Sequence, residues 1–195
     1  MTGPQSIFEG TDSAKGFACN AYLHLWNAGA GRTNVVTFLL YDEKAAGKSA
    51  VNIALRTAGD DDVAFARNLY FETMRGIVER LFGWDQSREE KNFARFFKLD
   101  EVRIITADGQ DVGWIQEQIS ERSINLGSFY VAPAMQGRGI GTQVLRMLLE
   151  RAARESKAMT LAVVKINPAR QFYEKRGFRT THEDAYKFYM SASPM

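Results

Sequence analysis

The sequence has few of the residues that build disulfide frameworks or metal centres. Cys19 is its single cysteine, so no disulfide can form within one chain, and this usage is typical of a reducing compartment such as the cytoplasm. The two histidines, His24 and His182, lie far apart in the sequence and do not match the ligand spacing of a zinc site. We therefore expect a cytoplasmic protein that holds no metal.

Long apolar runs and an excess of charge of one sign are also missing. The run VVTFLLY at residues 35–41 is among the longest, and it falls well short of the roughly 20 residues that span a bilayer. The N-terminus lacks the basic and apolar regions of a signal peptide. With 25 basic and 23 acidic residues the formal net charge is +2, which argues against a nucleic-acid footprint over the whole surface. We expect neither a membrane nor a nucleic-acid partner.

What remains is the composition of an ordinary soluble globular protein. Hydrophobic residues make up 45% and charged residues 25% of the 195 positions, which is enough for one domain with its own core. Residues 1–50 differ from the rest in their scattered glycines and small polar residues. The segment AAGKSA at 45–50 looks like part of a P-loop, but Asp42 stands where that motif needs its first glycine. We predict an N-terminal extension of uncertain structure over 1–50 and one domain over 51–195.

From residue 51 onward, hydrophobic periodicity indicates a mixture of strands and helices. Alternation with a period of two predicts strands, and apolar positions three and four residues apart predict helices. The predicted strands cover 51–58, 101–107, 111–120, 123–131, 159–165 and, as one or two strands, 178–190; the predicted helices cover 60–82, 87–99, 139–155 and 167–177. The dipeptide Asp108-Gly109 predicts a hairpin turn. This order predicts an α/β fold with a mostly antiparallel sheet and at least one crossover helix.

Local signals indicate where several helices begin and end. The acids at 60–62 are candidate N-caps of the first helix, which we expect Gly76 to interrupt. Ser87 is the expected N-cap of the second helix, because Glu90 follows at the capping-box position. In the last helix Asn167 is the expected N-cap, followed by a proline at the first helical position and closed by a glycine.

The segment QGRGIG at 136–141 carries three glycines at alternate positions, Gly137, Gly139 and Gly141, between a predicted strand and a predicted helix. A helix N-terminus has unpaired N–H groups and the positive end of the helix dipole, and glycines let a phosphate approach that backbone closely. Gln136 and Arg138 add a polar and a cationic side chain. The pattern predicts a phosphate or pyrophosphate site, although such loops also occur for packing reasons.

A dinucleotide site fits this loop poorly. It requires G-x-G-x-x-G and an acidic residue about 20 positions later, after a parallel strand. The loop instead reads G-x-G-x-G, and the next predicted strand ends in Lys165. A nucleotide-dependent oxidoreductase is therefore disfavoured.

Two segments together resemble the GNAT superfamily of N-acetyltransferases. Gln136, Gly139 and Gly141 fill its acyl-CoA signature, Q/R-x-x-G-x-G/A. The segment NPARQFYEKRGF at 167–178 resembles the downstream family segment, in which an Asn opens a helix, a Tyr lies near its middle and Gly-Phe ends it. The resemblance extends over the whole predicted domain in element order and is residue-specific over 129–178. It implies a GNAT-type fold, in which helices flank a mixed, mostly antiparallel sheet and acyl-CoA occupies a gap between two splayed strands.

The same resemblance implies a binding site for acetyl-CoA as co-substrate. The pantetheine arm would pair with the backbone of residues 129–131 like an added strand, and the pyrophosphate would lie on backbone N–H groups of residues 137–142. The side chain of Ile140 is expected to lie in the core. The expected donor-binding residues are Phe129, Tyr130, Val131, Gln136, Gly137, Arg138, Gly139, Ile140, Gly141, Thr142, Asn167 and Arg170.

The matching family position makes Tyr173 the expected general acid. A tyrosine hydroxyl has an ordinary pKa of about 10, against about 8.5 for a thiol, so it stays protonated at neutral pH and can donate a proton to the departing thiolate. By similarity to the family, a backbone N–H near Val131 would stabilise the tetrahedral oxyanion. The competing interpretation is that Tyr173 is a core aromatic, since Phe172 and Phe178 are near it in the sequence.

The acceptor site is marked less clearly. Trp84 and Asp85, between two predicted helices, place an aromatic face beside a carboxylate, which suits a cationic amine. Glu117 on a predicted strand is a third candidate acceptor-binding residue. Glu117, Glu72 and Asp85 are candidate general bases, although each also fits a solvated surface carboxylate. The pair Gly127-Ser128 stands where relatives can carry an acid, so no strand carboxylate is available there and a water relay is the alternative.

Two functions stay open. The first is transfer of the acetyl group of acetyl-CoA to a primary amine of a small molecule, a peptide or a protein. The second is a non-catalytic acyl-CoA-binding regulatory module, because a fold alone does not fix a function. Tyr173 favours catalysis, since a module that only binds acyl-CoA would not need it. We expect a monomer or a homodimer.

Overall fold

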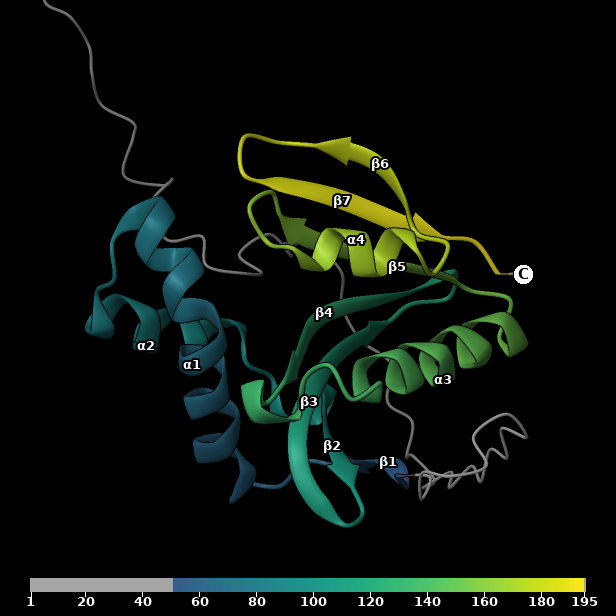
Figure 1. The fold of residues 1–195 in the computed structure, drawn as a ribbon. Helices are drawn as coiled ribbons and strands as arrows, with labels where there is room; N and C mark the ends of the chain where they lie inside the picture. The colour runs from purple at the N-terminus through teal and green to yellow at the C-terminus, as the bar shows by residue number, and fades with distance from the viewer. Residues whose placement is uncertain (1–50, 195) are drawn as a thin grey trace, which may run out of the picture.

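The computed structural model describes residues 51–194 as one open sheet with helices on both faces (Figure 1). The predictions made for residues 1–50 lie outside the described part of the chain. The strands are β1 Ile53–Thr57, β2 Val102–Ala107, β3 Gln110–Ile119, β4 Ser123–Val131, β5 Ala158–Val164, β6 Arg179–Glu183 and β7 Lys187–Ala192. The helices are α1 Asp62–Phe82, α2 Gln86–Phe96, α3 Ile140–Arg154 and α4 Ala169–Glu174, with short 3₁₀ turns at Leu99–Glu101 and Pro133–Met135.

The strands pair in the order β1-β2-β3-β4-β5-β7-β6. All neighbouring pairs are antiparallel except β4 and β5, which run parallel. Helix α3 connects these two strands, as a parallel pair requires. The predicted α/β fold with a mixed, mostly antiparallel sheet is therefore confirmed.

Two hydrophobic cores, one on each face of the sheet, hold the helices in place. Helices α1 and α2 cover one face, where Tyr70 and Phe93 pack in one cluster with Trp114 of β3. Helices α3 and α4 cover the other face, where Leu148 and Phe178 are buried. Figure 1 shows the two helix pairs on opposite sides of the sheet. We refer below to the α1 face and the α3 face.

Helix α1 is continuous, so the predicted interruption at Gly76 is wrong. A glycine inside a helix costs about 1 kcal/mol relative to alanine. Met74 and Val78, on either side of it, are buried against the sheet, and burial of each such side chain is worth about 1.5–3 kcal/mol. Packing therefore outweighs the local preference of the glycine.

Helix α2 begins before the predicted N-cap, so that prediction is also wrong. The N-cap is Asp85, whose Oδ1 accepts the backbone N–H of Arg88 at 2.8 Å. Ser87 lies inside the first turn, and Glu90 accepts from the side chain of Gln86 at 3.1 Å instead of closing a capping box. Two strong capping residues stand two positions apart, and the earlier one caps the helix.

Other local predictions are confirmed in whole or in part. Asp108 and Gly109 form the hairpin turn between β2 and β3, with φ of 50° and 80°. The Oδ1 of Asn167 accepts the backbone N–H of Ala169 at 2.9 Å, but α4 begins one residue later than predicted, with Pro168 at the N-cap position. Gly177, with φ of 90°, ends the turn that follows this helix.

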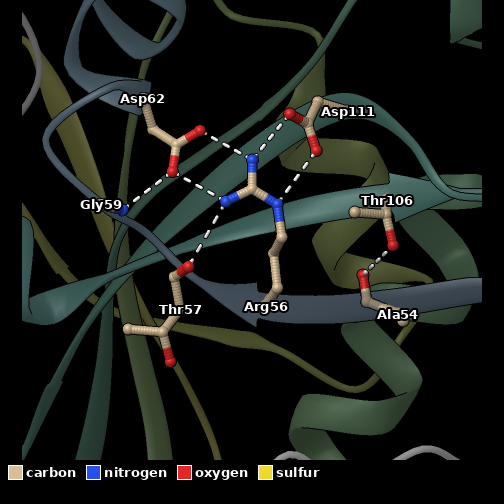
Figure 2. Close-up of polar contacts among 7 residues, drawn as sticks. All are labelled: Ala54, Arg56, Thr57, Gly59, Asp62, Thr106 and Asp111. Atoms are coloured by element: carbon tan, nitrogen blue, oxygen red, sulfur yellow. Dashed lines mark hydrogen bonds and ion pairs between the residues drawn. The ribbon is translucent and has the colours of Figure 1, made fainter.

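The start of α1 is fixed by ion pairs and not by a capping side chain. Figure 2 shows the guanidinium of Arg56 on β1 between the carboxylates of Asp62 and Asp111. Its NH2 lies 2.7 Å from Asp62 Oδ1 and 2.6 Å from Asp111 Oδ2, while Asp62 also accepts the N–H of Gly59 at 2.8 Å. Asp61, at the N-cap position, makes no capping hydrogen bond through its side chain. The cluster therefore ties α1 to β1 and β3.

Candidate active site

Strands β4 and β5 pair only at their beginnings. The parallel ladder joins 123–126 to 158–161, although β4 continues to Val131 and β5 to Val164. Over those remaining residues β4 pairs with β3 and β5 with β7. Figure 1 shows the two strands separating toward their C-terminal ends. The described residues thus form no ladder between the second half of β4 and β5, which is where an extended ligand can pair.

A β-bulge at Gly127 coincides with this divergence. Gln116 pairs with Ser128 and the next residue of β3 pairs with Leu126, which leaves Gly127 as the extra residue. Before the bulge, Leu126 packs in the core on the α3 face; after it, Tyr130 packs in the core on the α1 face. Even-numbered residues of β4 therefore lie on the α3 face before the bulge and on the α1 face after it.

The glycine loop combines two kinds of glycine. Gly137 and Gly139 have φ of 73° and 84°, which side chains other than glycine rarely adopt, and Gly139 is the N-cap of α3. Gly141 instead faces aromatic rings: a Cβ there would lie 3.6 Å from Phe172 and 3.7 Å from Phe129. In the described part of the chain, no acceptor contacts the backbone N–H groups from Gly137 to Thr142. This helix N-terminus is therefore open to an anion.

The side chains between and beside the glycines of the loop differ in their contacts and exposure. The amide Nε2 of Gln136 donates to the backbone oxygen of Val131 at 2.9 Å, so it ties the loop to the end of β4. Arg138 is exposed and makes no ion pair within residues 51–194. Ile140 is buried in the core on the α3 face, as predicted.

A cation at this helix N-terminus was missed by sequence reasoning. Arg176 donates to the hydroxyl of Thr142 in the first turn of α3 and to the backbone oxygen of Phe172, the latter at 2.7 Å. Its guanidinium lies 3.8 Å from the ring centre of Phe172. The residue belongs to the segment EKRGF, where a basic residue near a helix C-terminus is an ordinary feature, so no local signal pointed to the loop 34 residues earlier.

The segment at 167–178 lies against this loop and the end of β4. Tyr173 is 9% exposed, and its ring lies 5.2 Å from that of Phe172 and 5.7 Å from that of Phe178. Phe172 in turn lies 6.3 Å from Phe129 of β4. Arg170 forms an ion pair with Glu174 at 2.7 Å and stacks on Phe188 of β7. The structure thus brings β4, the start of α3 and α4 together.

The three predicted acceptor residues are not all close together. Trp84 packs on Phe71 of α1, and the guanidinium of Arg75 lies 5.2 Å from the centre of its ring. Asp85 is exposed and caps α2. Glu117 is 5% exposed and lies on the other face of the sheet, where Arg151 of α3 binds its two oxygens at 2.7 and 3.2 Å. The separation follows from strand alternation, which places Glu117 on the α3 face.

Two unpaired polar atoms on the α1 face were not predicted. Ser128 and Gln116, each 3% exposed, are direct partners across β3 and β4. Gln116 donates through Nε2 to the backbone oxygen of Phe96 and to Glu101, at 2.9 and 2.8 Å, which places its side chain on the α1 face. Within the described residues 51–194, the hydroxyl of Ser128 and the Oε1 of Gln116 have no hydrogen-bond partner. Buried polar atoms without partners are rare and mark a place for water or ligand.

The end of α1 also contacts the last hairpin. The ring of Phe82 lies 5.2 Å from that of Tyr186, in the turn between β6 and β7. The two segments belong to opposite sides of the β4–β5 divergence, because α1 covers β3 and β4 while β7 pairs with β5. The contact therefore bridges the divergence on the α1 face.

Residues 51–194 contain neither a membrane-spanning helix nor a cluster of metal-binding side chains. None of the described helices is long and apolar enough to cross a membrane. No group of three or more histidine, cysteine, aspartate or glutamate side chains among these residues could hold a metal ion.

Known proteins resemble this chain in sequence and in fold. The family model described as an acetyltransferase (GNAT) domain matches residues 98–180. A protein of Archaeoglobus fulgidus named as an uncharacterized N-acetyltransferase is 28% identical over 137 residues, which is 64% of this chain and 92% of that protein. The PaiA N-acetyltransferase of Thermoplasma acidophilum, solved in complex with coenzyme A, superposes with a TM-score of 0.59 at 21% identity, over 72% of this chain and 98% of that one.

A second solved structure gives the same result for the fold. The ribosomal-protein-S18-alanine N-acetyltransferase of Escherichia coli superposes with a TM-score of 0.53 at 18% identity and covers 73% of this chain and 94% of its own. The sequence match lies over the segments that form the β4–β5 divergence, the glycine loop and α4. Residues 98–180 of this chain therefore match the acetyltransferase (GNAT) domain, and residues 51–194 share the fold of these N-acetyltransferases.

Proposed function

We propose that the chain transfers the acetyl group of acetyl-CoA to a primary amine of a small molecule, a peptide or a protein. The observation that carries this proposal is the divergence of β4 and β5 directly beside an open helix N-terminus. An extended thioester and its pyrophosphate need these two features at adjacent places. The presence of coenzyme A in a solved structure of the same fold supports the assignment.

The donor would lie along the second half of β4. The pantetheine arm would pair with the backbone of Phe129, Tyr130 and Val131, because β5 forms no ladder with these residues. The pyrophosphate would accept hydrogen bonds from the N–H groups of Gly137 to Thr142. Arg176, which donates to Thr142, adds a positive charge beside this pyrophosphate site. We also propose Arg138 as a donor contact, because it is exposed on the same loop and carries no ion pair.

Acetyl transfer requires a proton donor for the departing thiolate of coenzyme A. We assign this role to Tyr173, whose hydroxyl would protonate the sulfur as the carbon–sulfur bond breaks. Its ring packs against Phe172 and Phe178, which holds it in place. A backbone N–H near Val131 would bind the oxyanion.

The amine must lose a proton before or during attack. We propose that a water held by Ser128 and Gln116 takes this proton, because the two residues are direct partners on the α1 face and their hydroxyl and amide oxygen have no hydrogen-bond partner among residues 51–194. Glu117 is less suited, since Arg151 and Arg103 of the α3 face already surround its carboxylate. Trp84 and Asp85, at the end of α1, stay proposed acceptor contacts.

The test measures thiol release from acetyl-CoA over a panel of primary amines. Tyr173→Phe is expected to lower kcat by about a hundredfold or more, the range for loss of a general acid, while the Kd for acetyl-CoA changes little. Tyr189→Phe is the matched control, because it removes a hydroxyl that bonds Asp184 on the β6–β7 hairpin. Unchanged kcat in Tyr173→Phe would remove this residue from the mechanism. Binding of acetyl-CoA without turnover on any amine would favour the non-catalytic module.

A further inference from the structure

Gly113 of β3 lies against the backbone of β4, at the end of the strand that is proposed to bind acetyl-CoA. Its φ is not positive, so its conformation does not require glycine. A Cβ added to Gly113 would lie only 2.3 Å from the carbonyl oxygen of Tyr130 and 3.0 Å from Cδ1 of Ile105. Any other residue would therefore displace this carbonyl. A glycine inside a strand often marks such a close approach of another backbone.

The hydrogen bonds between β3 and β4 show which way the backbone of Val131 points. The N–H of Ala132 donates to the oxygen of Val112 at 2.8 Å. In an antiparallel ladder, pairs of residues that exchange backbone hydrogen bonds alternate with pairs that exchange none. The neighbouring pair, Val131 with Gly113, is therefore one that exchanges none. The N–H of Val131 thus points away from β3, toward the β4–β5 divergence.

The carbonyl of Tyr130 and the N–H of Val131 belong to one peptide unit. The described residues contain no cis peptide bond, and in a trans peptide the C=O and the N–H point in opposite directions. The Cβ position of Gly113 is on the α3 face, because Ile105, which it would contact, lies in the core there. The Tyr130 oxygen therefore leans toward the α3 face and the Val131 N–H toward the α1 face, where the amine is proposed to lose its proton.

We infer that Gly113 is a positioning residue: it lets the Tyr130–Val131 peptide tilt, so that the Val131 N–H is aimed at the thioester oxygen of bound acetyl-CoA. This inference rests on the proposed function. When the amine nitrogen bonds to the thioester carbon, the electrons of the C=O double bond move to the oxygen, and the thiolate leaves as the carbonyl forms again. A donor stabilises that oxygen only if it is already fixed where the charge develops. A backbone N–H has no rotamers, so the residue opposite it decides its direction.

The experiment measures the infrared stretching frequency of the thioester carbonyl in protein-bound acetyl-CoA, isotopically labelled at that carbon, without an acceptor amine. A hydrogen bond to the oxygen weakens the C=O bond and lowers this frequency. Gly113→Ala should therefore give a higher frequency than the wild type. With an acceptor amine present, this variant should lower kcat by about a hundredfold, the scale for loss of one oxyanion donor, while the Kd for acetyl-CoA changes little.

The matched control is Ile105→Val, which loosens the core beside Gly113 without touching the Tyr130 carbonyl. It removes Cδ1, the second atom that a Cβ at Gly113 would meet. This variant should lower the unfolding temperature and keep the frequency and kcat of the wild type. The double variant Gly113→Ala with Ile105→Val keeps only the conflict with the Tyr130 oxygen, so its kcat should be as low as that of Gly113→Ala.

Val131→Pro keeps the experiment decisive if Gly113→Ala does not fold. It removes the N–H itself, and because this N–H makes no bond to β3, the proline costs the sheet no hydrogen bond. It should raise the carbonyl frequency as well.

Two results would overturn the inference: the wild-type frequency in Val131→Pro or in folded Gly113→Ala, or a kcat that the double variant restores. A failure of the proposed function has a different signature. If no amine is acetylated but the frequency still depends on Gly113, acetyl transfer is excluded and the positioning role stands.

Discussion

At the scale of single residues, the three glycines of the loop serve two different purposes within five positions. Gly137 and Gly139 supply backbone conformations with positive φ, whereas Gly141 has ordinary φ and lies against Phe129 and Phe172. The first two make the helix N-terminus accessible, and the third fits it against β4 and α4. Substitutions at these positions should therefore weaken stability or ligand binding for different physical reasons.

Gly139→Ala tests the conformational role. An alanine at φ of 84° is strained by about 1 kcal/mol, although open space surrounds the position. We expect a modest loss of stability and a weaker Kd for acetyl-CoA, because the N–H groups of α3 would turn away from the phosphates. Isothermal titration and thermal unfolding measure the two effects.

Gly76→Ala in α1 is the control for Gly139→Ala. It also has open space around it, but it lies in a regular helix, where alanine is favoured by about 1 kcal/mol. It should raise the unfolding temperature and leave the Kd unchanged. Equal affinity for acetyl-CoA in Gly139→Ala and the wild type would contradict the role given to the loop.

The loop itself could be predicted from the sequence, but the partners of its side chains could not. Gln136 bonds Val131 and Arg176 bonds Thr142, and the second pair joins residues 34 positions apart. Local patterns carry the backbone geometry that glycines impose. They carry no information on which distant side chain arrives beside the loop, because that depends on how α4 packs.

At the scale of elements, ion pairs attach helices to the sheet at two places. At the start of α1, Asp62 accepts hydrogen bonds from Arg56 and from the N–H of Gly59. These bonds hold the pKa of Asp62 below its ordinary value, although burial acts to raise it. At the other place, Arg151 of α3 pairs with the buried Glu117 of β3. The two sites differ in exposure, so their contributions should differ in size and in pH dependence.

Arg56→Met should lower the free energy of unfolding by about 1 kcal/mol at neutral pH, the usual scale for a partly exposed pair. A carboxyl whose folded-state pKa is lowered stabilises the protein above its unfolded pKa, about 3.9, and this stabilisation is lost as the pH falls through the folded value. The difference between variant and wild type should therefore shrink below about pH 4.

Urea unfolding at several pH values measures this difference. Arg146→Met is the control, because Arg146 is half exposed and its pair with Glu150 is 3.9 Å long. It should change the free energy of unfolding by less than about 0.5 kcal/mol at any pH. A destabilisation by Arg56→Met that stays constant down to pH 3 would show that the ion pair with Asp62 is not its source.

Arg151→Met should be much more damaging, since it leaves the Glu117 carboxylate buried with only Arg103 beside it, at 3.6 Å. Removing one partner of a buried pair typically costs about 3–5 kcal/mol. The double variant Glu117→Gln with Arg151→Met should recover most of this loss in urea unfolding. If the double variant is as unstable as the single one, packing of the arginine stem and not charge is responsible.

Element order was predictable, whereas element boundaries were decided by packing. The sequence periodicity indicated the four helices and the strands β1 to β5, because apolar spacing directly reflects burial. It left 178–190 as one or two strands, since β6 is exposed along its whole length. The break expected at Gly76 and the cap expected at Ser87 both relied on local propensity. In each case a tertiary contact or a stronger capping residue outweighed a preference of about 1 kcal/mol.

At the scale of the whole molecule, the sheet consists of two parts joined along a short seam. Four residues of β4 pair with four of β5, and beyond them the described strands separate. Coenzyme A bound in this place would add hydrogen bonds to the second half of β4. We predict that it protects the peptide 127–131 from hydrogen exchange, while the peptide 86–96 in α2 stays unchanged.

The same ligand should stabilise the fold as a whole. At a concentration one hundred times its Kd, coenzyme A adds about 2.7 kcal/mol to the free energy of unfolding. Mass-spectrometric exchange and thermal unfolding can be run on the same samples. Stabilisation without protection of 127–131 would mean that the ligand binds away from the divergence.

The seam also marks the limit of what could be predicted for the site. The resemblance indicated which strands diverge, and it implies that the glycine loop receives the phosphates. It did not indicate the bulge at Gly127, the unpaired hydroxyl of Ser128 or the close approach of Tyr130 to Gly113. Each of these depends on register between strands that are distant in sequence, and a register shift of one residue reverses every side chain that follows it.

The bulge at Gly127 has a consequence for how β4 can change over evolution. Deleting this one residue would make Leu126 and Ser128 consecutive, opposite Glu117 and Gln116, so β4 would lose its bulge while every side chain kept its face. Replacing Gly127 by another residue leaves the pairing register of β4 with β3 unchanged. A deletion at any other position of β4 would exchange the faces of the residues that follow it. We therefore expect Gly127 to be the position of this strand that tolerates a deletion, and other changes of length to accumulate in the connections on either side.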